Sequence, residues 1–407
     1  MNDDIPFALP LMGAEEEEAA RRVIRSRWLT TGKEALAFEE EFAAFLAPRH
    51  EAPPLAALAV NSATAGLHLA LEALGAGNGG TVLVPSLTFT STAEVARYLG
   101  AEPVLIDVKP GTFHIDPEAL ERTLDRLCRG LPAYPPRNGG GAGFGPTGRP
   151  QAVMPVHYGG LPCDMAAILE ICRRRGVKVI EDAAHAFPSE LPGGEFAGTL
   201  GDAGVFSFYA TKTITTGEGG MVVTRDREIA RRVSLMRLHG IDRQVWNRYT
   251  DRKASWYYEV VEPGYKYNMP DILAAIGRVQ LGRAREFLAM RLAIARRYDD
   301  AFRHEARLAI PPTGPGDARH LYPLSLDAAL DRDALIDTLK ERGIGVSVHF
   351  IPLHLMPWYK NRYGFEAGDF PASLDRFKRE ISLPIWPGMT ENQINRVADE
   401  VLSLVHR

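Results

Sequence analysis

The sequence predicts an α/β protein in which helices flank a mostly parallel sheet, with a smaller α+β domain at the C-terminal end. Short apolar runs alternate with helix-forming segments from about residue 55 to residue 184. Each run is almost continuously apolar, as expected of strands buried on both faces of a sheet. Strands that alternate with helices pair in parallel through right-handed crossovers. Beyond about residue 270 the alternation gives way to a long helical stretch.

The N-terminal part is predicted to form two helices. Helix-forming residues dominate from Glu15 to Ser26, and the segment 33–47 places a leucine and three phenylalanines near helical spacing. We expect the two helices to be joined by a turn at Thr30 to Gly32.

The central part is predicted to build the sheet. We expect strands at 55–60, 81–85, 102–108, 152–158 and 177–184, and helices at 64–76, 90–101 and 165–176. Two further strands, 203–209 and 220–224, flank a segment whose glycines suit a tight return in an otherwise parallel sheet. The Gly/Pro-rich stretch 130–150 has no apolar period and is predicted to be a mobile surface loop.

The predicted domain boundary lies near residue 270. Residues 1–270 are expected to form an N-terminal arm and the large domain, and residues 271–407 the small domain. The small domain begins with the helical stretch 271–302 and ends in a helix from Glu391 to His406.

Composition excludes several classes of protein. The formal net charge is −4, with 47 Lys plus Arg against 51 Asp plus Glu, and such a balance gives no indication of nucleic-acid binding. The three cysteines show no paired spacing, so neither a disulfide framework nor a cysteine zinc site is expected. The N-terminus does not resemble a signal peptide, and no stretch of 18 apolar residues occurs. We therefore expect a cytoplasmic protein without a membrane span.

Residues that follow the strands are the first candidates for a site, because ligands bind outside the carboxyl ends of the strands in an open α/β sheet. After the first strand come Ser62, Ala63 and Thr64 at the start of a helix, where short side chains and free amides can hold a phosphate. A plain helix cap is the alternative interpretation.

Four more residues follow later strands of the same sheet. Phe89 follows the second strand, Asp182 and His185 follow the apolar run 177–180, and Lys212 follows the strand at 203–209. Taken singly, each is explained as well by packing, capping or solvent exposure. Together, a phosphate seat, an aromatic ring, an acid and a lysine are the parts that hold pyridoxal phosphate.

The chemistry of that cofactor gives each part a role. An ionised Asp182 beside the pyridine nitrogen favours the protonated nitrogen, because opposite charges stabilise each other. The amine of Lys212 must reach the aldehyde and must also be available unprotonated to move a proton.

Several long segments resemble the DegT/DnrJ/StrS family of sugar aminotransferases. They include "NSATAGLHLALEALG", "PVHYGG", "VIEDAAHA", "FSFYATKTITTGEGGMVVT", "PGYKYNMPDILAAIGRVQL" and "SLPIWPGMT", and they occur in the family's order from about residue 30 to residue 390. The resemblance implies a fold type I pyridoxal-phosphate-dependent transferase. Within the family, the motifs are most similar to those of members that act on a nucleotide-linked 4-keto pentose.

The resemblance also implies roles for individual residues. Lys212 matches the lysine that bonds to the cofactor, Asp182 the partner of the pyridine nitrogen and Phe89 the ring that stacks on the cofactor. The other matches are Ser62, Ala63, Thr64 and Ser207 for the phosphate, His185 near the ring hydroxyl, His349 in the sugar pocket, and Asn268, which in the family reaches the phosphate of a neighbouring subunit. A homodimer with shared sites is therefore expected.

The implied reaction transfers an amino group from L-glutamate to a nucleotide-linked 4-keto-sugar. A 3-keto-sugar or an inosose remains an alternative acceptor, and so does a regulatory protein that binds the cofactor without turnover. Lys212 argues against the family's dehydratases, which carry His at that position. A dinucleotide oxidoreductase is also not expected, because the chain has "NSATAG" where such an enzyme needs GxGxxG.

The basic and aromatic segment 240–260 is a candidate for binding the sugar nucleotide. Its Arg248 and Arg252 could bind a diphosphate. A solvated basic loop with buried aromatic anchors explains the same residues equally well. The sequence also shows one departure from the family, since members usually lack the insertion at 130–150.

Overall fold

The computed structural model describes residues 4–47, 53–137, 143–242 and 258–406. Its large sheet has seven strands in the order β1-β7-β6-β5-β4-β2-β3. Their bounds are β1 Ala56–Val60, β2 Gly80–Pro85, β3 Glu102–Ile106, β4 Arg149–Val153, β5 Lys178–Asp182, β6 Ala203–Ser207 and β7 Gly220–Thr224. Strand β7 runs opposite to the other six, so its pairs with β1 and β6 are antiparallel and the remaining pairs are parallel. This confirms the predicted α/β class with a mostly parallel sheet.

Apolar side chains cover both faces of this sheet. In β7, Val222 packs into one core, whereas Met221 and Val223 pack into another. Alternate residues of a strand point to opposite faces, so both faces are buried and the strands are almost continuously apolar. The flanking helices are α3 Ala63–Ala73, α4 Ser91–Tyr98, α5 Pro117–Cys128, α6 Met165–Arg175 and α7 Arg227–Met236.

Helices α1 Ala14–Ser26 and α2 Lys33–Leu46 pack against α9 Asp271–Gly282. The carboxylate of Asp271 accepts hydrogen bonds from the backbone amides of Gly32 (2.7 Å), Glu34 (3.3 Å) and Ala35 (3.1 Å). An acid at a helix N-terminus satisfies amides that have no partner within the helix. The start of α9 therefore anchors α2, although the two helices are far apart in sequence.

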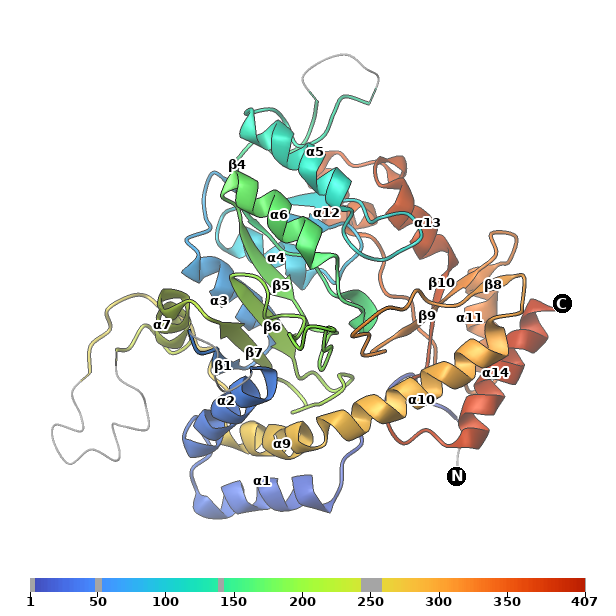
Figure 1. Ribbon diagram of the computed structural model, residues 1–407, viewed down its shortest axis with the longest axis horizontal. Coiled ribbons are helices and arrows are strands. Elements are labelled where there is room, and N and C mark those ends of the chain that lie inside the picture. Colours follow the sequence, from blue (N-terminus) through green and yellow to red (C-terminus); the bar gives the residue numbers. More distant parts are fainter. Residues whose placement is uncertain (1–3, 48–52, 138–142, 243–257, 407) are drawn as a thin grey trace.

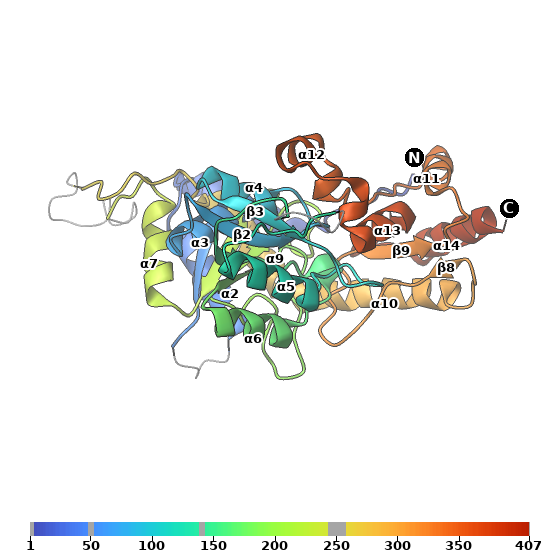
Figure 2. The same ribbon diagram turned by 90° about the horizontal axis from the view of Figure 1, so that it is seen from above.

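Helix α10 Ala284–Phe302 leads from this helical layer to the small sheet (Figure 1; Figure 2 shows the same arrangement from above). The small sheet is antiparallel, with the order β10-β9-β8. Its strands are β8 Leu308–Ala309, β9 Tyr322–Leu326 and β10 Glu380–Leu383, and the helices of this region are α11 Arg332–Glu341, α12 Pro357–Tyr363, α13 Pro371–Arg379 and α14 Glu391–Val405. Ile5 forms a β-bridge with Ile344, so the N-terminal segment lies against this small unit.

Three local expectations need correction. The predicted stretch 271–302 is two helices, because residue Arg283 leaves helical geometry between α9 and α10. The strand predicted at 152–158 begins at Arg149 and ends at Val153. The described part of the insertion 130–150 is not only surface, since Tyr134 is buried and its hydroxyl bonds with the backbone of Leu105. Within the described residues, no helix is long and apolar enough to cross a membrane.

Candidate active site

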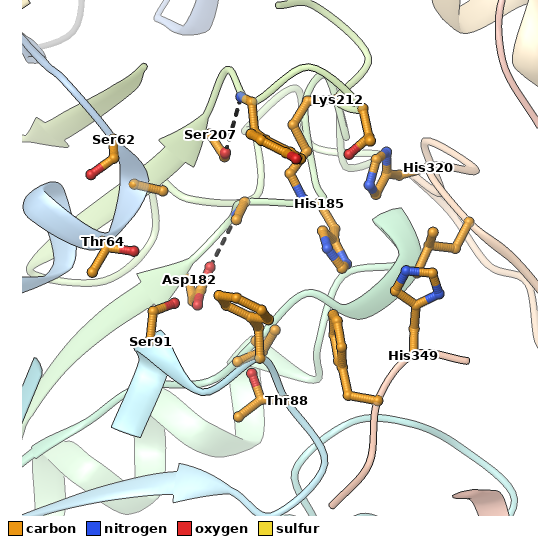
Figure 3. A pocket seen from close by; sticks show the side chains of 18 of the residues that line it. Ser62, Thr64, Thr88, Ser91, Asp182, His185, Ser207, Lys212, His320 and His349 are labelled. Carbon is orange, nitrogen blue, oxygen red and sulfur yellow. Dashed lines mark hydrogen bonds between the residues drawn. The ribbon is translucent and has the colours of Figure 1, made fainter. Parts of the chain in front are cut away.

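One cavity of about 450 Å³ collects most of the residues singled out from the sequence. Figure 3 shows side chains from several elements converging on it. Its lining includes Ser62, Ala63, Thr64, Phe89, Asp182, His185, Ser207, Lys212 and His349. The large sheet contributes strand ends, and His349 and Phe350 come from the segment that precedes α12. The cavity therefore lies at the carboxyl ends of the strands, between the large sheet and the C-terminal part of the chain.

The N-terminus of α3 forms one wall of the cavity. Ser62 caps the helix, because its hydroxyl accepts a hydrogen bond from the amide of Ala65 at 3.1 Å. The amides of Ala63 and Thr64 belong to the first turn, whose N–H groups have no partner within a helix. Helix capping and phosphate binding are therefore compatible at this position. The Ser62 hydroxyl accepts from the Ala65 amide, and the amides of the first residues remain available to bind an anion.

Gly220 of β7 lets the sheet approach this helix N-terminus. A Cβ atom at this position would lie 2.7 Å from the amide nitrogen of Ala63 and 2.9 Å from the carbonyl oxygen of Phe206. Both contacts are with backbone, which cannot move aside at low cost. Any larger residue would therefore displace the amides that a phosphate needs.

Asp182 ends β5 and is buried. Its carboxylate accepts hydrogen bonds from the hydroxyl of Thr92 at 2.9 Å and from the amide of Ala184 at 3.1 Å. Burial raises the pKa of Asp182, while these two donors and the charge of Lys212 lower it. A cationic ring nitrogen placed against this carboxylate would be a further partner that favours its ionised form.

The neighbouring acid, Glu181, points to the opposite face of the sheet and has a different role. Its carboxylate accepts hydrogen bonds from the amides of Gly198, Leu200 and Gly201 and lies 2.9 Å from the ring nitrogen Nε2 of His157. Both of its carboxylate oxygens are therefore occupied by groups of the protein. Of the two adjacent acids, only Asp182 lines the cavity.

Lys212 lies in the turn that follows β6, where its amide bonds to the carbonyl of Tyr209 at 2.9 Å. Protein atoms crowd its amine, although the cavity gives the side chain some access to solvent. Burial, together with the charge of Arg291, lowers the pKa of Lys212 to about 8, and the attraction of Asp182 opposes this shift. A larger fraction of unprotonated amine makes this lysine a better nucleophile than one on the surface.

Aromatic rings form the wall beside the amine. Phe89 is 57% exposed, and its ring centroid lies 5.8 Å from that of Phe350. His185 accepts a hydrogen bond at Nδ1 from the amide of Gly159 at 3.3 Å, which places its proton on Nε2. A ring with one open face suits stacking against a flat heterocycle.

The remaining predicted residues fall in different places. The hydroxyl of Ser207 accepts a hydrogen bond from the amide of Tyr209 at 3.3 Å and lines the cavity. Asn268 does not line the described cavity; its amide nitrogen donates to the hydroxyl of Thr31 at 2.6 Å. Arg248 and Arg252 lie outside the described residues.

The structure adds residues that the sequence analysis missed. The N-terminal segment contributes Phe7, whose ring stacks on that of His349 with centroids 5.3 Å apart. His320 also lines the cavity, with its ring centroid 4.5 Å from that of His185. Nothing in the local sequence pattern of either residue indicates a site, because both reach it only through the packing of distant segments.

Arg291 of α10 does not line the cavity, but it supports two residues that do. It is only 1% exposed, and its guanidinium donates to the carbonyls of His320 (3.1 Å) and Ile385 (2.8 Å). Within the described residues no carboxylate pairs with it. Burial lowers the pKa of Arg291 to about 10, which leaves it a cation at neutral pH, and this positive charge disfavours the protonated form of Lys212.

These residues fit pyridoxal phosphate. The free amides at α3 and the close approach of Gly220 suit its phosphate, the buried carboxylate of Asp182 suits its ring nitrogen, and the amine of Lys212 suits its aldehyde. The fold and the cavity together define a fold type I enzyme that depends on pyridoxal phosphate.

Comparison with known proteins identifies the family. The model described as the DegT/DnrJ/EryC1/StrS aminotransferase family matches residues 10–402, and the chain belongs to this family. The spore coat polysaccharide biosynthesis protein SpsC of Bacillus subtilis is 42% identical over 411 residues, which cover 99% of this chain and 98% of SpsC. The protein is thus a sugar aminotransferase.

Solved structures agree with this assignment. The PMP-form of the sugar aminotransferase Spr1654 from Streptococcus pneumoniae superposes with a TM-score of 0.86 at 28% identity, covering 99% of both chains. A structure described as DesI in the presence of its TDP-sugar product has a TM-score of 0.80 at 26% identity and covers 100% of this chain and 94% of DesI.

Proposed function

We propose that this sugar aminotransferase moves an amino group from L-glutamate to the 4-keto carbon of a nucleotide-linked sugar. The observation that carries the proposal is the cavity in which the amine of Lys212, the carboxylate of Asp182 and the N-terminus of α3 meet. The nucleotide is supported by the DesI structure, which is described with a TDP-sugar product. The relative SpsC is named for polysaccharide biosynthesis, which favours a product that enters a surface polysaccharide.

Different residues of the site would perform different parts of the reaction. Bound pyridoxal phosphate would supply an electron sink for ionising a carbon–hydrogen bond next to nitrogen. Asp182 would keep the proton on the ring nitrogen, and the hydroxyl of Thr92 donates a hydrogen bond that holds this carboxylate in place. Lys212 would take a proton at Nζ and return it to a neighbouring carbon, a task that suits an amine with a pKa of about 8.

The phosphate and the sugar would be held by different parts of the chain. The amides of Ala63 and Thr64 and the hydroxyl of Ser207 would hold the cofactor phosphate. His349 would line the sugar pocket, and Arg248 and Arg252 would bind the diphosphate of the acceptor. This division separates the chemistry from the recognition of the acceptor.

We also propose that the active unit is a homodimer in which Asn268 of one subunit serves the phosphate of the other. Asn268 forms a β-bridge with Val60 near the end of β1, yet its side chain bonds with Thr31 and Lys266 rather than entering the cavity of its own chain. Leu29, Tyr98 and Tyr209 are exposed apolar side chains that a partner subunit could cover.

The decisive experiment is an amino-transfer assay with the purified holoenzyme. It would offer L-glutamate as the donor and a panel of acceptors: nucleotide-linked 4-keto-sugars, nucleotide-linked 3-keto-sugars and an inosose. We expect transfer to a 4-keto nucleotide sugar and loss of the cofactor's visible absorbance on adding glutamate alone. Transfer to the inosose and to none of the nucleotide sugars would refute the acceptor class, and an unchanged spectrum with glutamate would refute the donor.

A further inference from the structure

His349 is held at three points by the residues around it. Its backbone amide donates to Oε2 of Glu380 at 2.9 Å, and its carbonyl accepts the hydroxyl of Tyr158. Its ring nitrogen Nδ1 lies 2.9 Å from the hydroxyl oxygen of Ser382. The ring itself stacks on Phe7, so that little freedom remains for it.

Ser382 connects the ring of His349 to the same glutamate. The serine hydroxyl lies 2.5 Å from Oε1 of Glu380, and both residues belong to β10. A continuous chain of hydrogen bonds therefore runs from Glu380 through Ser382 to His349, which lines the cavity with Lys212. Glu380 and Ser382 are buried, so water does not compete with this chain.

The protonation state of Glu380 decides the direction of the chain. A serine hydroxyl has one proton to donate. If Glu380 is a neutral acid, it donates to Ser382, Ser382 donates to Nδ1, and the histidine proton sits on Nε2. If Glu380 is ionised, Ser382 donates to it and accepts from Nδ1–H, so that Nε2 faces the cavity without a proton.

The two directions present opposite groups to a substrate. The carbonyl oxygen of a keto-sugar can only accept a hydrogen bond, so it needs the proton on Nε2. We propose that Glu380, acting through Ser382, positions His349 as the hydrogen-bond donor to the carbonyl oxygen of the acceptor sugar. The proposal rests on the sugar-acceptor part of the proposed function and makes Glu380 a positioning residue.

The surroundings of Glu380 are consistent with a neutral acid at physiological pH. Burial raises the pKa of Glu380 to about 8, although the hydrogen bonds from Ser382 and His349 and the charge of Arg332 on α11 oppose this shift. Tyr158, next to it, is a neutral phenol, and burial raises its pKa further. Across the antiparallel pair, Glu380 faces Ser325 of β9, whose hydroxyl accepts from Arg376 of α13 at 2.7 Å.

The test compares the two half-reactions at pH 7 and pH 9 in the wild-type holoenzyme and three variants. Glu380→Gln keeps the shape and mimics the neutral acid, because its amide can donate to Ser382 while its oxygen accepts from the amide of His349. Ser382→Ala breaks the chain. Asp375→Asn, an exposed carboxylate paired with Arg379, is the matched control.

In the wild type, we expect the half-reaction with a thymidine-diphosphate 4-keto-sugar to fall roughly 3- to 10-fold between pH 7 and pH 9, the range for one lost hydrogen bond. Glu380→Gln should match the wild type at pH 7 and lack its fall near pH 8. Ser382→Ala should be slow at both values. All variants should keep the glutamate half-reaction. The same pH dependence in Glu380→Gln, or equal losses in both half-reactions, would overturn the proposal.

A second measurement does not depend on turnover. Nitrogen-15 spectra of histidine-labelled holoenzyme, assigned with a His349→Gln variant, distinguish the protonated ring nitrogen from the bare one. At pH 7 the proton should sit on Nε2 in the wild type and in Glu380→Gln, and it should move to Nδ1 in the wild type alone at pH 9. A wild-type ring protonated on Nδ1 at pH 7 refutes the proposed chain, whereas failure of every keto-sugar to react refutes the proposed function.

Discussion

The pKa of Lys212 leads to a quantitative prediction for the capture of pyridoxal phosphate by the apoprotein. Capture requires the unprotonated amine, because only that form carries a lone pair. At pH 7 an amine with a pKa of about 8 is unprotonated in about a tenth of the molecules, whereas an ordinary lysine at 10.5 is unprotonated in roughly three in ten thousand. Burial therefore raises the reactive fraction about 300-fold.

The perturbation is to remove the charge of Asp182. Asp182→Asn keeps the size of the side chain but abolishes the attraction that favours the ammonium form of Lys212. The pKa of Lys212 should therefore fall below 8 in this variant. Asp300→Asn, an exposed carboxylate paired with Arg303, serves as the control and should leave the pKa unchanged.

The assay follows the visible absorbance of lysine-bound cofactor after mixing apoprotein with pyridoxal phosphate across a range of pH. In the wild type the capture rate should rise with pH, with a midpoint near pH 8, and level off only at higher pH. In Asp182→Asn the midpoint should shift downward, whatever the change in final affinity. A wild-type midpoint near 10.5, or an upward shift in the variant, contradicts the electrostatic account of this pocket.

Three further outcomes follow from the site. Lys212→Ala should remove both the visible absorbance and turnover, and borohydride reduction of the wild type should mark Lys212 on peptide mapping; a mark elsewhere would reassign the lysine. Mixing inactive Lys212→Ala with inactive Asn268→Asp subunits should restore part of the activity, because one site of each heterodimer keeps both native residues; no recovery after proven subunit exchange argues against shared sites. Gly220→Ala should weaken cofactor binding by equilibrium titration, since its Cβ would meet the amide of Ala63, whereas Gly282→Ala, with open space around it, should not.

Apart from β4, the strands of the sheet were predictable because each is marked by an apolar run of a few consecutive residues. The apolar runs at 55–60, 81–85 and 203–209 coincide with β1, β2 and β6 to within two residues. The predicted return in the sheet is β7, which is antiparallel to both neighbours. The apolar run of a buried parallel strand is a local feature of the sequence, so the strand can be predicted without knowing which strands pair with it.

The misplaced elements depend on contacts that are distant in sequence. Helix periodicity continues through residues 271–302, so only Gly282 marks the break between α9 and α10. The insertion 130–150 has the composition of a loop, and its burial at Tyr134 depends on bonds to Leu105. A high content of Gly and Pro predicts a loop without regular structure, but it does not predict whether that loop packs against the core.

The same distinction separates the site residues that were found from those that were missed. Lys212 and Asp182 follow strands, and the rule for strand ends in α/β sheets identified them from sequence. Phe7 and His320 line the cavity from an N-terminal extension and an irregular segment, and Arg291 supports its wall from a helix, so no rule for strand ends applies to them. They could be found only after the segments that carry them had been placed in space.

This origin of the cavity walls suggests how the enzyme can combine fixed chemistry with a variable acceptor. The proposed phosphate site, the acid and the lysine lie at strand ends of the large sheet, and these ends cannot shift without unpairing the sheet. The opposite wall comes from segments held by side chains: Phe7 stacks on His349, Arg291 bonds the carbonyls of His320 and Ile385, and Glu380 binds His349 directly and through Ser382. A substitution in these supports would change how the acceptor is held while the lysine and the acid keep their places. Ser382→Ala should therefore slow the sugar half-reaction and spare the glutamate half-reaction, which no purely structural disturbance of the sheet would do.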